Sequence, residues 1–290
     1  MDNKRIITAA VTGSWGTKEQ NAAIPMTPEE IADDVYDVWK AGAAVVHIHV
    51  RDDDMKPKMD TEKFKKTIKL IREKCDIVIN MTSSGDPLAD DEGRIGPARA
   101  IFPIDELRPE ISSYDCGTMN WMHNSIHRNS PWLLENLGKL CMEWNVVPEL
   151  ECFDVGHVYN TFHYQKTGCL PKEHPHYQFI MGAPGGIDAT VENLVFIKNL
   201  LPPDATWGAA GLSKAHIPIM LATLSLGGHL RVGLEDNIYY SHGVLAKSNS
   251  QLVKRAADLI ELCNFEVATP DEARKILHID REYTGKGARK

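Results

Sequence analysis

The stretch Thr27–Val50, TPEEIADDVYDVWKAGAAVVHIHV, contains a full set of helix signals followed directly by a strand signal. Thr27 can cap a helix, Pro28 suits the first helical position, and Glu30 stands where a capping box places its acid. Gly42 ends the helical pattern, and the apolar run 43–50 is typical of a buried strand. A helix that leads straight into a buried strand is the unit from which α/β folds are built.

The same alternation continues along the chain, which leaves a closed parallel barrel or a doubly wound open sheet. No Gly-x-Gly-x-x-Gly follows the first strand, and this disfavours the dinucleotide-binding open sheet. We therefore predict a (β/α)8 TIM barrel, one domain over residues 1–290 with a short C-terminal helical extension at about 269–290. The predicted strands are Ile6–Thr12, Ala43–Val50, Asp76–Thr82, Glu110–Tyr114, Val146–Phe153, His176–Met181, Thr206–Ala210 and His229–Gly233. Further helices are predicted at Glu62–Lys74, near Gly96–Ile101, and at Pro131–Glu143, Val155–Lys166, Thr190–Leu200, Ile217–Leu226 and Asn249–Leu262.

Composition narrows the class of protein. The hydrophobic content of 43% fits a globular fold, and the net charge of −8 without a basic stripe disfavours a nucleic-acid partner. The six cysteines form no Cys-x-x-Cys pair, so we expect reduced, mostly buried thiols. The first apolar run, residues 6–11, is too short for a signal peptide or a membrane span. We expect a cytoplasmic protein that does not associate with a membrane.

Two histidines stand at the end of the second predicted strand. His47 and His49 are two residues apart, so their side chains point to the same face, and paired imidazoles at a strand end commonly seat a divalent metal such as zinc. The alternative is a pair of barrel-lining histidines held by hydrogen bonds. A third ligand would decide between these interpretations.

The last strand ends in a second cluster of charged residues. Glu235 can complete a two-His-one-carboxylate site because strand ends meet around one mouth in a barrel. Asp236 would be a nearby carboxylate free to act as a base, and Arg231 could hold its charge or grip a substrate carboxylate. The alternative is a surface Glu-Asp pair with a structural arginine.

Other strand ends carry groups that could contact a substrate, although each is also an ordinary loop residue. Two glycine-bearing loops, 182–186 and 211–216, could admit a phosphate or a pantetheine chain, or could be tight turns. No Gly-x-Ser-x-Gly elbow supports a serine hydrolase. The polar groups at strand ends are Thr82, Ser83, Ser84, Ser112, Ser113, Glu149 and Glu151, and the residues of interest in the loops are Gly185, Gly186, Gly211 and Ser213.

Taken together, these stretches resemble the β-keto acid cleavage enzyme family over nearly the full length of the chain. The two metal-bearing stretches are the most specific part of the resemblance. The stretches that carry it are Thr8–Gly13, Thr27–Glu30, His47–Arg51, Asn145–Glu149, Gly182–Gly186, Gly227–Asn237 and Ala268–Pro270.

The resemblance implies a zinc-bearing barrel that exchanges a β-keto acid and acetyl-CoA for acetoacetate and a new acyl-CoA. It implies His47, His49 and Glu235 as metal ligands, Arg231 and Asp236 as a catalytic pair, and Glu151 as a supporting carboxylate. It places substrate-gripping hydroxyls at Thr82 or Ser83 and at Ser113, and the two glycine-bearing loops are expected to receive CoA.

One position departs from the family pattern. Members that take the 5-amino substrate carry a glutamate shortly after the first strand, where this chain has Ser14 and Trp15. An ammonium group without its carboxylate would be poorly compensated, so we expect a different substrate. Trp15 could face an apolar chain or a quaternary ammonium group, as in dehydrocarnitine, or could serve only in packing.

We therefore predict that Asp236, oriented by Arg231, removes a proton from C2 of the keto acid, and that the resulting enolate attacks acetyl-CoA. A zinc-dependent hydrolase or lyase using metal-bound hydroxide is the rival enzyme class, and a small-molecule binder is the non-enzymatic one. We also expect a homo-oligomer, with a tetramer as one candidate state.

Overall fold

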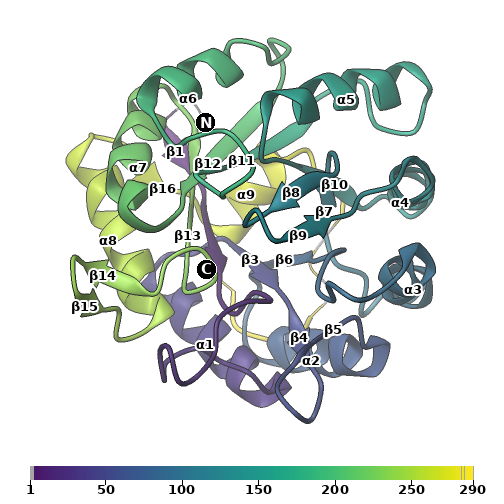
Figure 1. Cartoon of the computed structure of the whole chain (residues 1–290). Coiled ribbons are helices and arrows are strands. Elements are labelled where there is room, and N and C mark those ends of the chain that lie inside the picture. The colour runs from purple at the N-terminus through teal and green to yellow at the C-terminus, as the bar shows by residue number, and fades with distance from the viewer. Residues whose placement is uncertain (1–2, 282, 284, 290) are drawn as a thin grey trace.

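The computed structural model describes residues 3–281, 283 and 285–289, and its centre is a closed barrel of parallel strands surrounded by helices (Figure 1). Each barrel strand pairs with the next in chain order, and the last pairs with the first, so that the sheet has no free edge. This confirms the predicted TIM barrel. The barrel strands are β2 (Ile7–Ala10), β3 (Val45–Ile48), β6 (Val78–Met81), β7 (Ile111–Asp115), β10 (Val147–Cys152), β11 (His176–Met181), β12 (Thr206–Gly211) and β13 (His229–Val232).

A helix follows each barrel strand, and most helices begin at a side-chain cap. Thr27 and Glu30 form the predicted capping box at the start of the first helix. Asp, Ser or Thr side chains cap the other helices, except the one at 216–225. The helices are α1 (Pro28–Ala41), α2 (Thr61–Lys74), α3 (Asp91–Ile101), α4 (Pro131–Glu143), α5 (Val155–Lys166), α6 (Val191–Lys198), α7 (His216–Ser225, preceded by the 3-10 turn Ser213–Ala215), α8 (Asn249–Leu262) and α9 (Pro270–Ile276).

The hydrophobic core has two main parts. The larger part lies between the barrel strands and the surrounding helices, and it includes Val46, Ile48 and Ile79. The smaller part fills the N-terminal end of the barrel interior, where Val45 and Val78 contact residues of α9. Because apolar side chains and α9 close that end among the described residues, we expect a site at the C-terminal end of the barrel.

Short antiparallel hairpins rise from three of the loops that follow barrel strands, and the sequence did not predict them. They stand after β3, β7 and β13, at the C-terminal face of the barrel, where they can shape the entrance to a site. A two-stranded parallel pair, β1 (Lys4–Arg5) with β16 (Glu266–Val267), lies outside the barrel. The hairpins are β4 (Val50–Arg51) with β5 (Pro57–Lys58), β8 (Met119–Trp121) with β9 (Ser125–His127), and β14 (Tyr239–Ser241) with β15 (Val244–Leu245).

The predicted helical extension at 269–290 is helical only in α9, and the prediction was wrong for the described residues after Ile276. There the backbone N–H groups of Lys286, Gly287 and Ala288 donate to carbonyls at the end of α2. These bonds replace the ladder that a continuing helix would need. Residues 282, 284 and 290 lie outside the described residues. Among the helices that are described, none combines the length and the apolar character needed to cross a bilayer.

Candidate metal centre and active site

The two histidines and Glu235 converge at the C-terminal face of the barrel. His47 is the last residue but one of β3, His49 follows just after the strand, and Glu235 lies just beyond β13. The Nε2 atoms of the histidines are 3.0 Å apart, and Glu235 Oε1 lies 3.6 Å from His47 Nε2 and 3.5 Å from His49 Nε2. Ligand atoms around a tetrahedral zinc with bonds of about 2.0–2.2 Å are separated by roughly 3.3–3.6 Å. The triangle therefore has the dimensions of a single ion's coordination shell.

Hydrogen bonding prepares His49 to present its Nε2 atom. Its Nδ1 lies 3.0 Å from Ser14 Oγ, and this hydroxyl donates to the carbonyl of Gly85 at 3.2 Å. With its own proton so used, Ser14 Oγ accepts the Nδ1–H of His49, which leaves Nε2 unprotonated. Burial lowers the pKa of His47 to about 4, so the imidazole of His47 is neutral near pH 7. Neutral imidazole is the form that binds a metal.

Three carboxylates surround the buried guanidinium of Arg231, one of them buried and two partly exposed. Its Nη1 donates to Glu151 at 2.9 Å, its Nη2 donates to Glu235 at 2.9 Å, and it holds both oxygens of Asp236 at 3.1 Å. Burial raises the pKa of Asp236 above its usual value, although Arg231 opposes that shift. Burial also raises the pKa of Glu151, and the nearby Asp115 adds to the effect. The pair Arg231–Asp236 thus holds a carboxylate with elevated basicity beside the His–His–Glu triangle.

The balance of charge supports a bound cation. Arg231 offsets one of the three carboxylates, and the excess of negative charge is costly unless a cation binds or protons are taken up. Burial and this excess together raise the pKa values of Glu151 and Asp236. Glu235 Oε2 is buried and finds no hydrogen-bond partner among the described residues. Burial by itself would raise the pKa of Glu235, but His49, His47 and Arg231 together hold it well below its usual range. An ionised carboxylate with a free oxygen beside two imidazole nitrogens fits a divalent zinc ion.

Backbone geometry brings the Glu235 side chain against the loop that follows β2. Gly13 adopts a φ of +64°, and a Cβ atom there would lie 2.6 Å from Glu235 Cγ. Gly233 has a φ of +153°, and a Cβ atom there would lie 1.9 Å from the carbonyl oxygen of Ala10. Glycine is therefore required at both positions. Arg51 clamps the same loop, because its Nη2 donates to the carbonyls of Gly13 at 2.7 Å and of Gly16 at 3.0 Å.

The predicted substrate hydroxyls lie on the neighbouring strand ends. Ser113 Oγ accepts a hydrogen bond from the backbone N–H of Ser83 at 3.0 Å, and the two hydroxyl oxygens are 3.4 Å apart. Thr82 is fully buried, and its hydroxyl accepts from the backbone N–H of Ser84 at 3.1 Å. Ser83 and Ser113 therefore lie side by side, whereas the hydroxyl of Thr82 is bonded within the turn that follows β6.

An acidic residue and an aromatic wall at this face were missed by the sequence analysis. Asp115, at the end of β7, is buried beside Glu151 and lies 3.0 Å from His127 Nε2. Trp121 stacks on Trp15 with ring centroids 6.0 Å apart and contacts Phe153 edge-on at 5.8 Å. Trp15 is 57% exposed, so one face of the wall is open to solvent. The only sequence signal was the short run of aromatic and histidine residues within 119–127.

With this geometry in place, comparison with known proteins identifies the family. The family model described as beta-keto acid cleavage enzyme matches residues 4–279. The chain belongs to the β-keto acid cleavage enzyme family. It is 41% identical to the 3-keto-5-aminohexanoate cleavage enzyme of Fusobacterium nucleatum, over 97% of this chain and 100% of that protein. It is 34% identical to the 3-oxoadipate:acetyl-CoA acetyltransferase of Cupriavidus necator, over 94% of both chains.

A relative at lower identity and a solved structure extend the comparison. The chain is 31% identical to the 3-dehydrocarnitine:acetyl-CoA trimethylamine transferase of Rhizobium meliloti, over 97% of this chain and 98% of that protein. The apo structure of ObcA superimposes with a TM-score of 0.79 at 16% identity. That match covers 89% of this chain and 66% of ObcA, and at this identity it supports the fold alone.

The glycines predicted for CoA binding in this family member have packing roles of their own. A Cβ atom at Gly185 would lie 1.7 Å from the carbonyl oxygen of Asn120, and one at Gly186 would lie 2.3 Å from that of Phe153. At Gly211 it would lie 2.5 Å from the carbonyl oxygen of Ala215. Ser213, with a φ of +54°, donates its N–H to the carbonyl of Asp236 at 3.5 Å. Close packing thus accounts for the glycines, and their contact with CoA stays a prediction.

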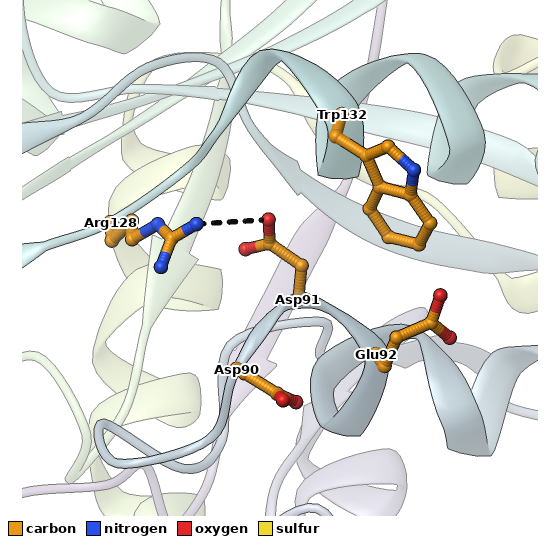
Figure 2. A pocket seen from close by; sticks show the side chains of 5 residues that line it. All are labelled: Asp90, Asp91, Glu92, Arg128 and Trp132. Atoms are coloured by element: carbon orange, nitrogen blue, oxygen red, sulfur yellow. Dashed lines mark hydrogen bonds and ion pairs between the residues drawn. The ribbon is translucent and has the colours of Figure 1, made fainter.

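A separate surface cavity of about 260 Å³ lies between the starts of α3 and α4 (Figure 2). Its charged residues are already engaged: Asp91 pairs with Arg128 at 3.3 Å, Glu92 pairs with Arg99, and Asp90 caps α3. Trp132 forms one wall of this cavity. Because the cavity shares no residue with the His–His–Glu triangle, we assign it no role in the chemistry.

Proposed function

We propose that this β-keto acid cleavage enzyme binds one zinc ion through His47, His49 and Glu235. We further propose that it exchanges a β-keto acid and acetyl-CoA for acetoacetate and a new acyl-CoA. The observation that supports this most strongly is the meeting of the three ligand atoms with the Arg231–Asp236 pair at one barrel mouth. Several relatives carry names that specify transfer to or from acetyl-CoA.

In the proposed reaction, a bound zinc ion would supply Lewis-acid stabilisation of the negative charge that develops on the keto oxygen. Asp236 removes a proton from C2 of the keto acid, since burial has raised its basicity and Arg231 fixes both of its oxygens. Ser83 and Ser113 are placed to donate hydrogen bonds to the substrate carboxylate.

The carbanion at C2 then attacks the carbonyl carbon of acetyl-CoA, forming a carbon–carbon bond and releasing the CoA thiolate. The thiolate attacks the original keto carbon, and the bond between that carbon and C2 breaks. The acyl group leaves as its CoA thioester, and C2 regains a proton from Asp236 to complete acetoacetate. Atoms and charge balance without a further co-reactant.

We infer that the distal end of the keto acid lies against Trp15 and Trp121. The stacked indoles offer an apolar face that is partly open, and aromatic faces of this kind suit an apolar chain or a quaternary ammonium group. Dehydrocarnitine is a keto acid of the second type. The 5-amino substrate is disfavoured, since Trp15 stands where the members that use it carry a glutamate.

A panel of β-keto acids with cationic, apolar and acidic side chains tests both parts of the proposal. Each is incubated with acetyl-CoA and zinc-loaded protein, and the acyl-CoA products are identified by mass spectrometry. We expect acetyl-CoA-dependent product with dehydrocarnitine or an apolar keto acid. Cleavage without acetyl-CoA would favour a metal-dependent hydrolase or lyase, and robust turnover of the 5-amino compound would overturn the role given to Trp15.

A further inference from the structure

Asn249 is a fully buried amide that the proposed reaction does not use. It is the first residue of α8, and Ser248 before it caps that helix. Its Oδ1 accepts the backbone N–H of Leu234 at 2.7 Å. Its Nδ2 donates to the carbonyl of Val11 at 2.9 Å and to Asp34 Oδ2 at 2.7 Å. One side chain thereby links four segments of the fold.

The chemistry of these neighbours fixes the orientation of the amide. A backbone N–H can only donate, while a backbone carbonyl and a carboxylate accept. Both acceptors lie on the Nδ2 side and the donor lies on the Oδ1 side, so a flipped amide would lose all three bonds. Because the site is dry, each lost bond leaves a buried polar group without a partner.

The two backbone segments that Asn249 joins are those that place Glu235. Leu234 directly precedes Glu235, and Val11 stands two residues before Gly13, whose backbone presses on the Glu235 side chain. The backbone N–H of Glu235 also donates to the carbonyl of Ala10 at 3.2 Å. Asn249 therefore ties the end of β13 to the end of β2 at the level of the metal ligand, and α8 packs against both strands and α1 (Figure 1).

We propose that Asn249 is a positioning residue for Glu235, and that it sets the metal affinity of the site by holding the segments 11–13 and 233–235 in register. The proposal rests on the proposed zinc-dependent function. A ligand held within about 0.5 Å of its productive geometry loses little freedom on binding, whereas a loose one must be ordered at the moment of binding.

Zinc affinity measured by competition with a fluorescent chelator tests this role independently of turnover. We expect Asn249→Ala to weaken zinc binding about 10–100-fold, as changes behind a first ligand shell typically do. Ser248→Ala is the matched control, since it weakens the same helix end without touching Leu234 or Val11. It should lower Tm by a few degrees and leave zinc affinity within about twofold of wild type.

A second pair of variants keeps the test decisive if Asn249→Ala does not fold. Asn249→Asp retains the acceptor for Leu234 but turns the donor toward Val11 and Asp34 into an acceptor, so zinc affinity should fall. Adding Asp34→Asn restores a donor to that pair and should recover part of the lost affinity. The swap preserves size and overall charge, so its recovery reports on the hydrogen bonds.

Two results would overturn the positioning role: equal loss of zinc affinity in Asn249→Ala and Ser248→Ala, or wild-type affinity in Asn249→Ala and Asn249→Asp. Either result leaves the proposed function intact, provided that the wild-type protein binds zinc and uses acetyl-CoA. A wild-type protein that binds no zinc would instead contradict the proposed function itself.

Discussion

At the C-terminal end of the barrel three carboxylates share the buried Arg231, whereas near the N-terminal end Arg72 and Arg274 share one buried carboxylate, Glu110. Both clusters lie in dry surroundings, where an unbalanced charge is costly. At the N-terminal end the guanidiniums satisfy Glu110 with bonds of 3.2 Å, and the backbone N–H of Ile79 adds another at 3.0 Å. Arg274 also pairs with Asp271 at 3.2 Å, so both oxygens of Glu110 and both guanidiniums have partners, and we regard this cluster as structural.

The cluster at the C-terminal end has the opposite character. It has more carboxylates than guanidiniums, and Glu235 Oε2 has no hydrogen-bond partner among the described residues. The pKa of Asp236 is raised above its usual value. We interpret the contrast as a separation of stability from chemistry: the satisfied charges at the N-terminal end hold the fold, and the charges around Arg231 would serve the proposed cation and substrate. Variants that affect one cluster should therefore leave the function of the other unchanged.

The largest effect is expected for Asp236→Asn. The amide keeps the shape but cannot take a proton, so kcat should fall roughly 10²–10⁴-fold. Zinc content should stay at the wild-type level, because Asp236 is not one of the three ligands. The measurements are acyl-CoA formation and metal analysis of the same sample. Wild-type turnover in this variant would show that Asp236 is not the base.

At the other end, Glu110→Ala should act on stability alone. It leaves Arg72 and Arg274 buried without their shared partner, and breaking a buried ion pair in this way costs about 3–5 kcal/mol of unfolding free energy. Denaturant unfolding gives the free energy, and zinc competition on the folded fraction should give the wild-type affinity. If Glu110→Ala lost zinc affinity while its free energy of unfolding stayed unchanged, the cluster at Glu110 would not be a purely structural one.

The pH dependence of unfolding should carry the signature of Glu110. Burial would raise its pKa, but Arg72 and Arg274 lower it to about 2. Because the folded-state pKa is depressed, its contribution is complete above the ordinary value near 4.5 and is lost as the pH falls toward 2. The loss should reach about 3 kcal/mol. In Glu110→Gln, the free energy of unfolding should depend less on pH between about pH 4.5 and 2. The same dependence in the variant and the wild type would show that Glu110 is not the source of the acid sensitivity.

The smallest effect is expected for Ser14→Ala, which removes the hydrogen bond to His49 Nδ1 without touching a charge. Zinc affinity should fall about tenfold, at the lower end of the range for such supporting groups. Ser112→Ala is the matched control, since its buried hydroxyl donates to the Met81 carbonyl instead. Equal zinc affinities in the two variants would show that the hydroxyl of Ser14 does not support zinc binding.

Much of the fold and the ligand set follows from local patterns. Strand and helix periods, the capping box at Thr27 and the rule that barrel sites lie at strand ends led to the TIM barrel. The same rule predicted that His47, His49 and Glu235 lie close together, and in the structure their ligand atoms do. These features depend on spacing within short segments or on a fixed topology.

The remaining features depend on contacts that no local pattern encodes. Asp115 contacts His127 because the β8–β9 hairpin brings His127 back toward the end of β7. The strands of this hairpin have three residues each, which is too few for an alternation of polar and apolar residues to be recognised in the sequence. Asn249 looked like an ordinary residue at a helix start, and its three partners come from distant segments. The helix predicted after Ile276 is absent from the described residues because backbone N–H groups there donate to carbonyls at the end of α2 instead.

The clamp that Arg51 places on Gly13 and Gly16 has a consequence for redesign of the enzyme. Between these two anchored carbonyls only Ser14 and Trp15 carry side chains, and Ser14 is engaged with His49. A saturation library at position 15 should therefore explore new substrate preferences on a fixed backbone, with the proposed metal ligands undisturbed. Libraries that include position 13 should yield mostly inactive clones, since any side chain there collides with Glu235.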